Sequence, residues 1–171
     1  MVLTQSESDT VETLRQLVRL IAVDPASVSF AVEETADNVW LFVSTARENY
    51  GPLVGAKAST VMGLQWLALK LNSDRPVRLS IEKSDGFPEF GLHSARANRA
   101  DAMPRDELLA LISSLLDRVV PGCPHSESRH GTMLLVSIGG MDHNEMHNIG
   151  AICRALAWTH KAQCCVERAA G

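Results

Sequence analysis

The chain has 171 residues, of which 46% are hydrophobic and 21% charged, and its formal net charge is -4 at pH 7. This composition allows a buried core and excludes a globally disordered chain. The acidic balance argues against a large non-specific nucleic-acid footprint, although it leaves room for a local basic patch. No signal peptide is recognisable, and no apolar run reaches the roughly 18 residues that span a membrane. The sequence predicts a soluble, cytoplasmic protein with reduced cysteines and no membrane contact.

The first half of the chain reads as a helix followed by two strands. Asp9 and Glu12 have the spacing of a helix cap, and the helix should stop before Asp24-Pro25 because proline disfavours a helical residue before it. Alternating apolar residues over 28–33 predict a strand with one buried face. The continuous apolar run 39–43 predicts a central strand covered on both faces.

A short glycine-bearing segment follows, and it carries the strongest functional signal. A helix over 46–54 should lead into a turn at 55–58, then a helix over 59–71 and a strand over 77–82. Such a turn directs backbone N–H groups and the ammonium of Lys57 toward the start of the second helix. A phosphate fits there, because unpaired N–H groups and the helix dipole both favour an anion. The alternative for Lys57 is a solvated lysine in an ordinary helix–helix turn.

The order helix, strand, strand, helix, turn, helix, strand resembles a type II KH domain, and especially the small bacterial KH proteins of the KhpA kind. Three segments carry the resemblance: 17–28, 48–60 and 77–82. It covers about residues 11–83, so we place a KH-like domain at 9–83. In that family a Gly-x-x-Gly turn grips the backbone of single-stranded RNA, and the neighbouring helix and strand form a groove for unpaired bases.

The resemblance assigns roles to individual positions. Gly55 matches the first glycine of the turn, Lys57 fills a variable place, and Ala58 stands where the second glycine belongs, where its Cβ narrows the approach of a phosphate. One face of the strand over 77–81 would wall the base groove. The implied RNA-binding residues are Gly55, Ala56, Lys57, Ala58, Ser59 and Leu64.

The rest of the chain divides into a linker and a second unit. Residues 84–105 read as a linker or elaborated loop, in which Arg96 and Arg99 could extend the phosphate track or remain solvated. Residues 106–171 repeat the pattern of the first half, with a helix over 106–120, a polar stretch over 121–131 and a strand over 133–137. Because 149–151 echoes the glycine turn, we predict an α+β fold of tandem KH-like units, the second one degenerate, with three-stranded sheets and helices on one face.

The tryptophans and histidines can each be interpreted as ligand-binding residues or as ordinary structural ones. Trp40, Trp66 and Trp158 could stack on bases, but their apolar surroundings favour core packing. His143 and His147 share a helix face and could bind a metal with Cys123 and His125. Surface histidines and a helix cap at 142–145 explain the same residues, so no metal or other cofactor is expected.

The sequence therefore favours a non-catalytic protein that binds single-stranded RNA. It contains no Walker loop and no nucleophile elbow, which argues against an enzyme. The alternative is a protein-interaction or scaffold module on a KH frame that has lost its ligand, which fits the net charge of -4 and the missing second glycine. A protein partner or a homodimer remains open on either reading.

Overall fold

The computed structural model describes residues 2–72, 74–84 and 99–170. The predicted α+β class is confirmed, because the described chain contains two three-stranded sheets and five α-helices. In each sheet the first two strands are antiparallel and the last strand runs parallel to the central one. The strands are β1 (Ser29–Glu34), β2 (Val39–Thr45), β3 (Val77–Lys83), β4 (His125–His130), β5 (Met133–Ile138) and β6 (Gln163–Arg168).

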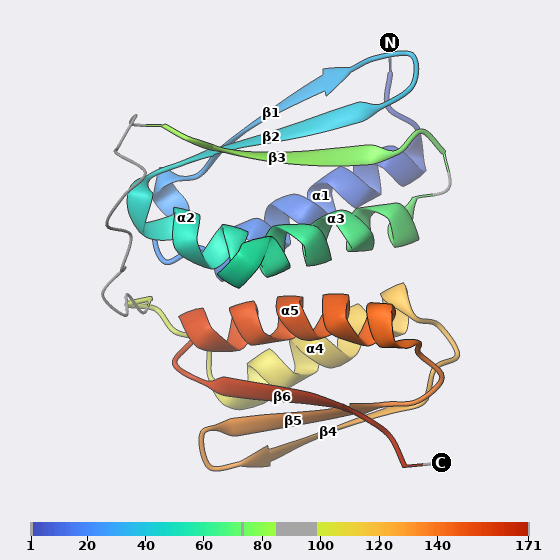
Figure 1. The fold of residues 1–171 in the computed structure, drawn as a ribbon. Coiled ribbons are helices and arrows are strands. Elements are labelled where there is room, and N and C mark those ends of the chain that lie inside the picture. The colour runs from blue at the N-terminus through green and yellow to red at the C-terminus, as the bar shows by residue number, and fades with distance from the viewer. Residues whose placement is uncertain (1, 73, 85–98, 171) are drawn as a thin grey trace.

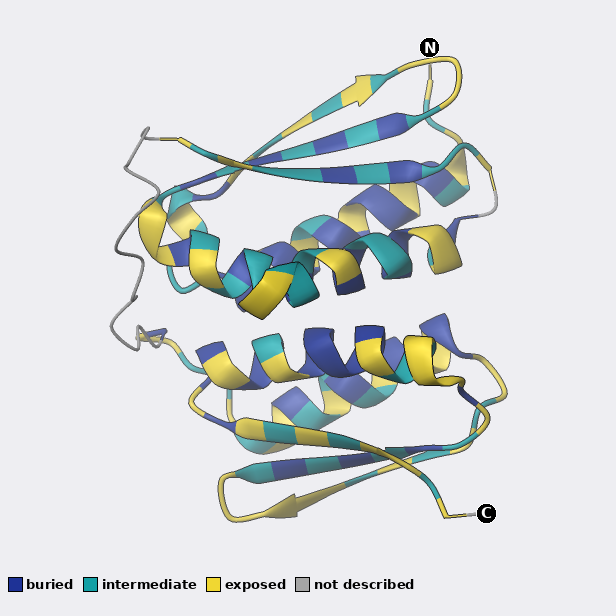
Figure 2. Ribbon diagram, in the orientation of Figure 1, coloured by how far each residue is buried: buried dark blue, intermediate teal, exposed yellow. Residues whose placement is uncertain are grey.

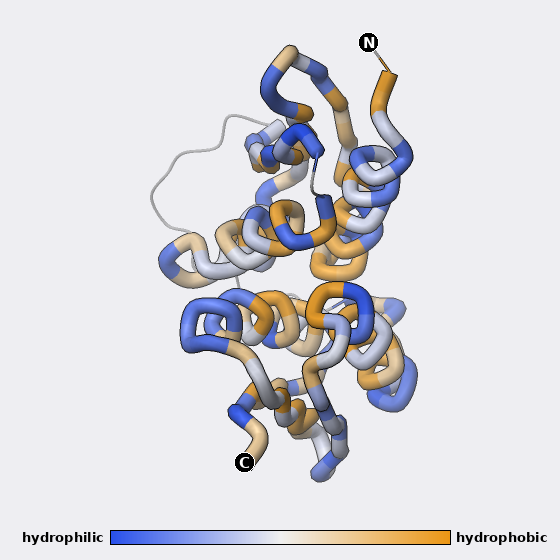
Figure 3. Tube along the Cα trace, turned by 90° about the vertical axis from the view of Figure 1, so that its right-hand side faces the viewer, coloured by the Kyte–Doolittle hydropathy of each residue, from blue (hydrophilic) through white to orange (hydrophobic). Residues whose placement is uncertain are grey.

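The helices lie between the two sheets, so the molecule has four layers (Figure 1). Those of the first half are α1 (Gln5–Ile21), α2 (Arg47–Val54) and α3 (Ser59–Leu71), and those of the second half are α4 (Arg105–Val119) and α5 (His143–Thr159). Apolar residues concentrate where the helices of the two halves meet (Figure 3). The buried apolar side chains of both halves form one cluster, so the halves share a core.

Helices α3 and α5 make the main contact between the halves, and they run antiparallel. Gly63 lies at their crossing. A Cβ built on Gly63 would come within 2.8 Å of the backbone oxygen of Asn148, so only glycine permits this approach. At one end of the pair the ammonium of Lys70 contacts the carboxylate of Glu145 at 2.6 Å.

The C-terminal end of α1 joins the halves a second time. The backbone oxygen of Leu20, which has no partner within the helix, accepts hydrogen bonds from Arg99 Nη1, Thr159 Oγ1 and His160 Nε2 at 3.4, 3.4 and 2.9 Å. His160 Nδ1 accepts from the N–H of Met103 at 2.7 Å. Burial lowers the pKa of His160, which keeps its ring neutral and matches one donating and one accepting nitrogen.

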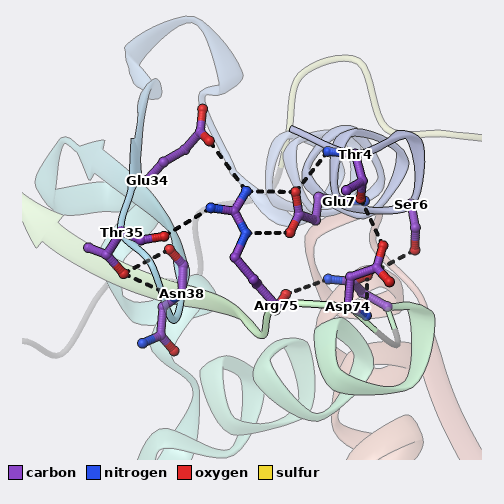
Figure 4. A network of polar contacts seen from close by, with 9 residues as sticks. Thr4, Ser6, Glu7, Glu34, Thr35, Asn38, Asp74 and Arg75 are labelled. Atoms are coloured by element: carbon purple, nitrogen blue, oxygen red, sulfur yellow. Dashed lines mark hydrogen bonds and ion pairs between the residues drawn. The ribbon is translucent and has the colours of Figure 1, made fainter. Parts of the chain in front are cut away.

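The start of α1 is held by an ionic network (Figure 4). Glu7 is fully buried and takes two hydrogen bonds from Arg75, at 2.7 and 2.9 Å. Arg75 also contacts Glu34 at 3.3 Å. The hydrogen bond from Arg75 is the main reason why the pKa of Glu7 falls to about 2. Glu7 also forms a capping box with Thr4 at the start of α1. The helix begins at Gln5, so the predicted start at Asp9 is wrong.

The central strand of the first sheet is covered on one face only, contrary to the prediction. Helices pack against the side chains of Val39, Leu41 and Val43, which are fully buried. Trp40 and Phe42 alternate with them and lie on the opposite face, which no described helix covers (Figure 2). The core assignment of Trp40 is therefore wrong.

The second half also departs from its predicted pattern. The stretch over 121–131, which was predicted only to be polar, contains β4, and its pairing with β5 completes the three-stranded sheet that was predicted for this half. The segment 149–151 is not a turn but lies in the middle of α5, a single helix between β5 and β6 where the first half has two. The sequence echo of the glycine turn was therefore misleading.

Candidate functional site

The predicted turn is present between α2 and α3, and it has an unusual backbone. Gly55 ends α2 with φ 77° and ψ 169°, and a single 3₁₀ turn over Ala56–Ala58 leads into α3. Lys57 and Ala58 both adopt positive φ, 53° and 62°. No side chain caps α3 at Ala58, so the first N–H groups of the helix lack the side-chain acceptor that a cap supplies.

Gly55 is required at its position for two reasons. Its positive φ is strained for any residue with a Cβ. A Cβ built there would also overlap the side chain of Thr60 and come within 2.7 Å of the Thr60 backbone nitrogen. The tight approach of Gly55 to Thr60 therefore fixes the path of the chain into α3.

A cleft of about 520 Å³ opens beside this turn. One wall comes from the turn and the start of α3, including Gly55, Ala56 and Ser59. The other wall comes from α5 and includes Arg154 and Trp158. The cleft thus lies between the two halves of the chain, at the end of the α3–α5 pair away from Lys70.

The wall from α5 supplies a cation and an aromatic ring. Arg154 is exposed, and within the described chain it makes no ion pair. Its guanidinium lies above Gly150, where an added Cβ would come within 2.9 Å of Nη1. Trp158 leaves 49% of its surface exposed, so its predicted burial in the core is wrong. Lys57, also exposed, has no hydrogen-bond or ion-pair partner among the described residues. The cleft at the uncapped start of α3 is therefore lined by one unpaired cation and an indole, and a second unpaired cation, Lys57, lies in the adjoining turn.

The buried part of the predicted groove is not available to a ligand. Leu64 is fully buried and points into the core, which corrects its assignment as a groove wall. On the strand, Val77 and Leu79 are 0% and 9% exposed, whereas Arg78 and Ser80 on the opposite face are half-buried, and the prediction did not specify a face. The neighbouring Gln65 instead lies along the free edge of β3, donating to the oxygen of Val77 at 2.8 Å and accepting from the N–H of Leu79 at 2.9 Å.

Arg99 does not extend a phosphate track. It is 8% exposed, and it forms a bidentate pair with Asp101 at 2.9 and 2.8 Å. It also donates to the backbone oxygen of Arg19 at 2.8 Å, so it connects the linker to α1. Arg96 lies outside the described residues.

The histidines of the second half do not form the predicted cluster of metal ligands among the described residues. No three His, Cys, Asp or Glu side chains in the described part of the chain come together in a way that could hold a metal ion. His125 contacts Glu127 at 2.6 Å and Asp117 at 2.9 Å, and the hydrogen bond to Asp117 is the largest cause of its raised pKa. His143 and His147 lie in the first turns of α5, where Asp142 and Glu145 form the predicted cap.

Local sequence reading missed the contribution of α5 to the cleft. Arg154 and Trp158 lie about a hundred residues from the turn, and no local pattern links them to it.

No protein-family model matches the chain, and no curated protein sequence matches it significantly. Among the described helices, none is both long and apolar enough to cross a membrane.

Proposed function

We propose that the protein binds single-stranded RNA, without catalysis, and that the sugar–phosphate backbone contacts the turn at Gly55. The observation that carries this proposal is the uncapped start of α3 at a cleft lined by the unpaired Arg154. Lys57 does not line the cleft but lies in the adjoining turn, next to the lining residue Ala56. The N–H groups of Ala58 and Ser59 already donate to Gly55 and Ala56, so a phosphate there would accept hydrogen bonds from the following N–H groups of α3, which no described side chain caps, and would gain from the helix dipole. The proposal goes beyond the resemblance to KH domains, because Arg154 comes from the second half of the chain.

An unpaired base has a partner in the same cleft. The exposed indole of Trp158 can stack on a base, which contributes about 1–3 kcal/mol per base and tolerates any sequence. The cleft volume of about 520 Å³ lies within the range of small-ligand pockets. It supports binding of an unpaired nucleotide rather than a duplex.

The charges predict weak binding with a shallow salt dependence. Arg154 is the one basic residue of the described chain that lines the cleft, Lys57 lies in the adjoining turn, and the net charge is -4. Two phosphate contacts on a single strand give a slope of about -1.4 in a plot of log affinity against log salt. A much steeper slope would require basic residues elsewhere on the protein.

The test is a titration of short single-stranded RNA at low salt with three charge-reversal variants. Lys57→Asp and Arg154→Glu should each abolish measurable binding, since each reverses one of the two unpaired cations. Arg168→Glu is the matched control, because Arg168 is exposed at the end of β6, away from the cleft (Figure 1). Unchanged affinity in the first two variants, or an equal loss in the control, would refute the assigned site.

The second candidate is a protein-interaction module. Met62 and Leu69 are 60% and 48% exposed and lie seven residues apart, on one face of α3. Under this reading the wild-type protein shows no salt-dependent RNA binding, and Met62→Lys rather than Lys57→Asp removes its ligand. The RNA titration therefore separates the two candidates.

A further inference from the structure

The outer face of the first sheet presents an aromatic pair. The rings of Trp40 and Phe42 are stacked, with centroids 6.0 Å apart and an interplanar angle of 18°. Both side chains are only partly buried, and they are not among the apolar residues that pack on the core. No described helix lies over this face (Figure 1). A paired aromatic surface is thus available on an open sheet.

The strand register places opposite charges on either side of this pair. Glu33 on β1 lies beside Trp40 on β2, and Trp40 lies beside Arg78 on β3. Glu33 and Arg78 are two strands apart, about 10 Å, with Trp40 between them, and no ion pair joins them. Glu33 is exposed and has no ion pair within the described chain. Arg78 makes only a long hydrogen bond to Asn38, at 3.3 Å.

We propose that this face binds a second copy of the chain, with the two sheets stacked face to face about a two-fold axis parallel to β2. Such an axis places β3 of one copy over β1 of the other. Glu33 then meets Arg78 of the partner subunit, and the reciprocal pair forms on the other side of the axis. Trp40 and Phe42 meet the same residues of the other copy at the centre. Aligned sheets stack at about 10 Å, which side chains of this size fill.

The charge pattern favours a second copy over an unrelated partner. One acidic and one basic residue flank the aromatic centre in the same row, so the face is complementary to itself. A hollow of about 360 Å³ beside Phe42, lined also by Ser29 and Glu82, leaves room for an incoming side chain. The outer face of the second sheet has no such row, because Leu135 at its centre lies between Ser128 and Cys165.

The size of the face sets the expected affinity. Three strands about 4.8 Å apart and six residues of about 3.3 Å each give a footprint of roughly 15 by 20 Å. This footprint is about 300 Å² per copy, or roughly 600 Å² for the two copies together, which is below the range of stable interfaces. The dimer should therefore be weak and transient, with a dissociation constant in the high micromolar range. The dimer does not involve the cleft at Gly55, and its failure would leave the RNA proposal standing.

Sedimentation velocity across the micromolar range tests the proposal. The wild type should pass from monomer to dimer, and Glu33→Arg and Arg78→Glu should each raise the dissociation constant at least tenfold, because each places like charges together. The double variant Glu33→Arg with Arg78→Glu should restore the dimer, since it exchanges the two charges. Ser128→Arg adds a positive charge to the second sheet as the control and should change nothing.

Three outcomes overturn the proposal. The first is a wild type that stays monomeric at every concentration. The second is a dimer that the single reversals leave intact or that the double variant does not restore. The third is a loss of dimer in Ser128→Arg equal to that in Glu33→Arg, which would indicate a different interface. Circular dichroism of each variant separates a lost dimer from a lost fold.

Discussion

Helices α3 and α5 pack side by side in opposite directions, and their N-terminal ends are built differently. At the start of α5, Asp142 and Glu145 form a capping box, with hydrogen bonds of 2.8 and 3.1 Å. Lys70 from α3 closes this end by pairing with Glu145. At the start of α3, Ala58 offers no cap, and Arg154 from α5 pairs with no carboxylate of the described residues.

The difference shows which of the two helix ends is better suited to an external anion. Each end meets a basic residue of the opposite helix, but only the end at α5 also has its own acidic groups. Asp142 and Glu145 accept hydrogen bonds from backbone N–H groups at the start of α5, and Glu145 also pairs with Lys70. An external anion would therefore gain little at this end. At α3 no side chain caps the helix, and among the described residues the acceptors for its first N–H groups are the backbone oxygens of Gly55 and Ala56, so that end is the better place for a phosphate.

Gly55 is the position where the largest effect is expected. Gly55→Ala adds both a strained positive φ and a collision with Thr60, so stability should fall by roughly 2 kcal/mol or more, and RNA binding should be lost with the turn. Gly122→Ala is the matched control, because Gly122 has φ 83° but open space around its Cβ. That variant should lose only about 1 kcal/mol in chemical denaturation. Equal losses would show that the contact with Thr60 is unimportant.

Removing the cap of α5 should have the next largest effect. Asp142→Ala leaves the N–H of Glu145 without its acceptor, which costs about 1 kcal/mol and lowers the unfolding midpoint by roughly 2–4 °C. Asp37→Ala removes the same charge from an exposed loop without removing a cap and should change the midpoint little. If both variants melt alike, the capping box does not distinguish the two ends.

Relieving the strain at the start of α3 should stabilise the protein slightly. Ala58 has φ 62°, so Ala58→Gly should add up to about 1 kcal/mol and should also strengthen RNA binding by opening the approach to the turn. Lys57→Gly relieves the same kind of strain but removes the cation, so it should gain stability and lose affinity. A weaker or equal titration for Ala58→Gly would count against the idea that its methyl group obstructs RNA.

The smallest effect is expected at the ion pair that closes the α5 end. Lys70→Met should cost less than about 1 kcal/mol, because the pair is partly exposed to solvent. The hydrogen bond from Lys70 is the largest cause of the lowered pKa of Glu145, so the pair stabilises the fold at neutral pH and its contribution is lost as acid protonates Glu145. The difference between Lys70→Met and wild type in thermal unfolding should therefore shrink at low pH. A difference that grows in acid would contradict this assignment.

Local patterns predicted most of the first half and its turn. The helix around Leu17, the strand over 77–82 and the bend at Gly55 follow from periodicity and turn chemistry, which act between near neighbours. Burial was harder to predict. The apolar run at Trp40 indicated a strand covered on both faces, because sequence alone does not show that helices occupy only one side of the sheet.

The second half was predicted less well because its elements depend on distant partners. Strand β4 contains no large apolar residue, and its pairing with β5 gives it its structure. Gly150 reads locally as a turn, yet α5 carries it in the middle of a helix that packs against α3. Arg154 reaches the cleft only through this packing, so no local pattern predicts its role.

The hydrogen bonds that converge on the carbonyl of Leu20 have a consequence for how the molecule unfolds. Arg99, Thr159 and His160 reach that single oxygen from the linker and from the end of α5. If the second half unfolded, Leu20 would lose the hydrogen bonds from Thr159 and His160, and if the first half unfolded, these donors would lose their acceptor. Unfolding of either half would also expose the shared core to solvent. The protein should accordingly behave as one cooperative unit, with a single calorimetric transition whose van't Hoff and calorimetric enthalpies agree.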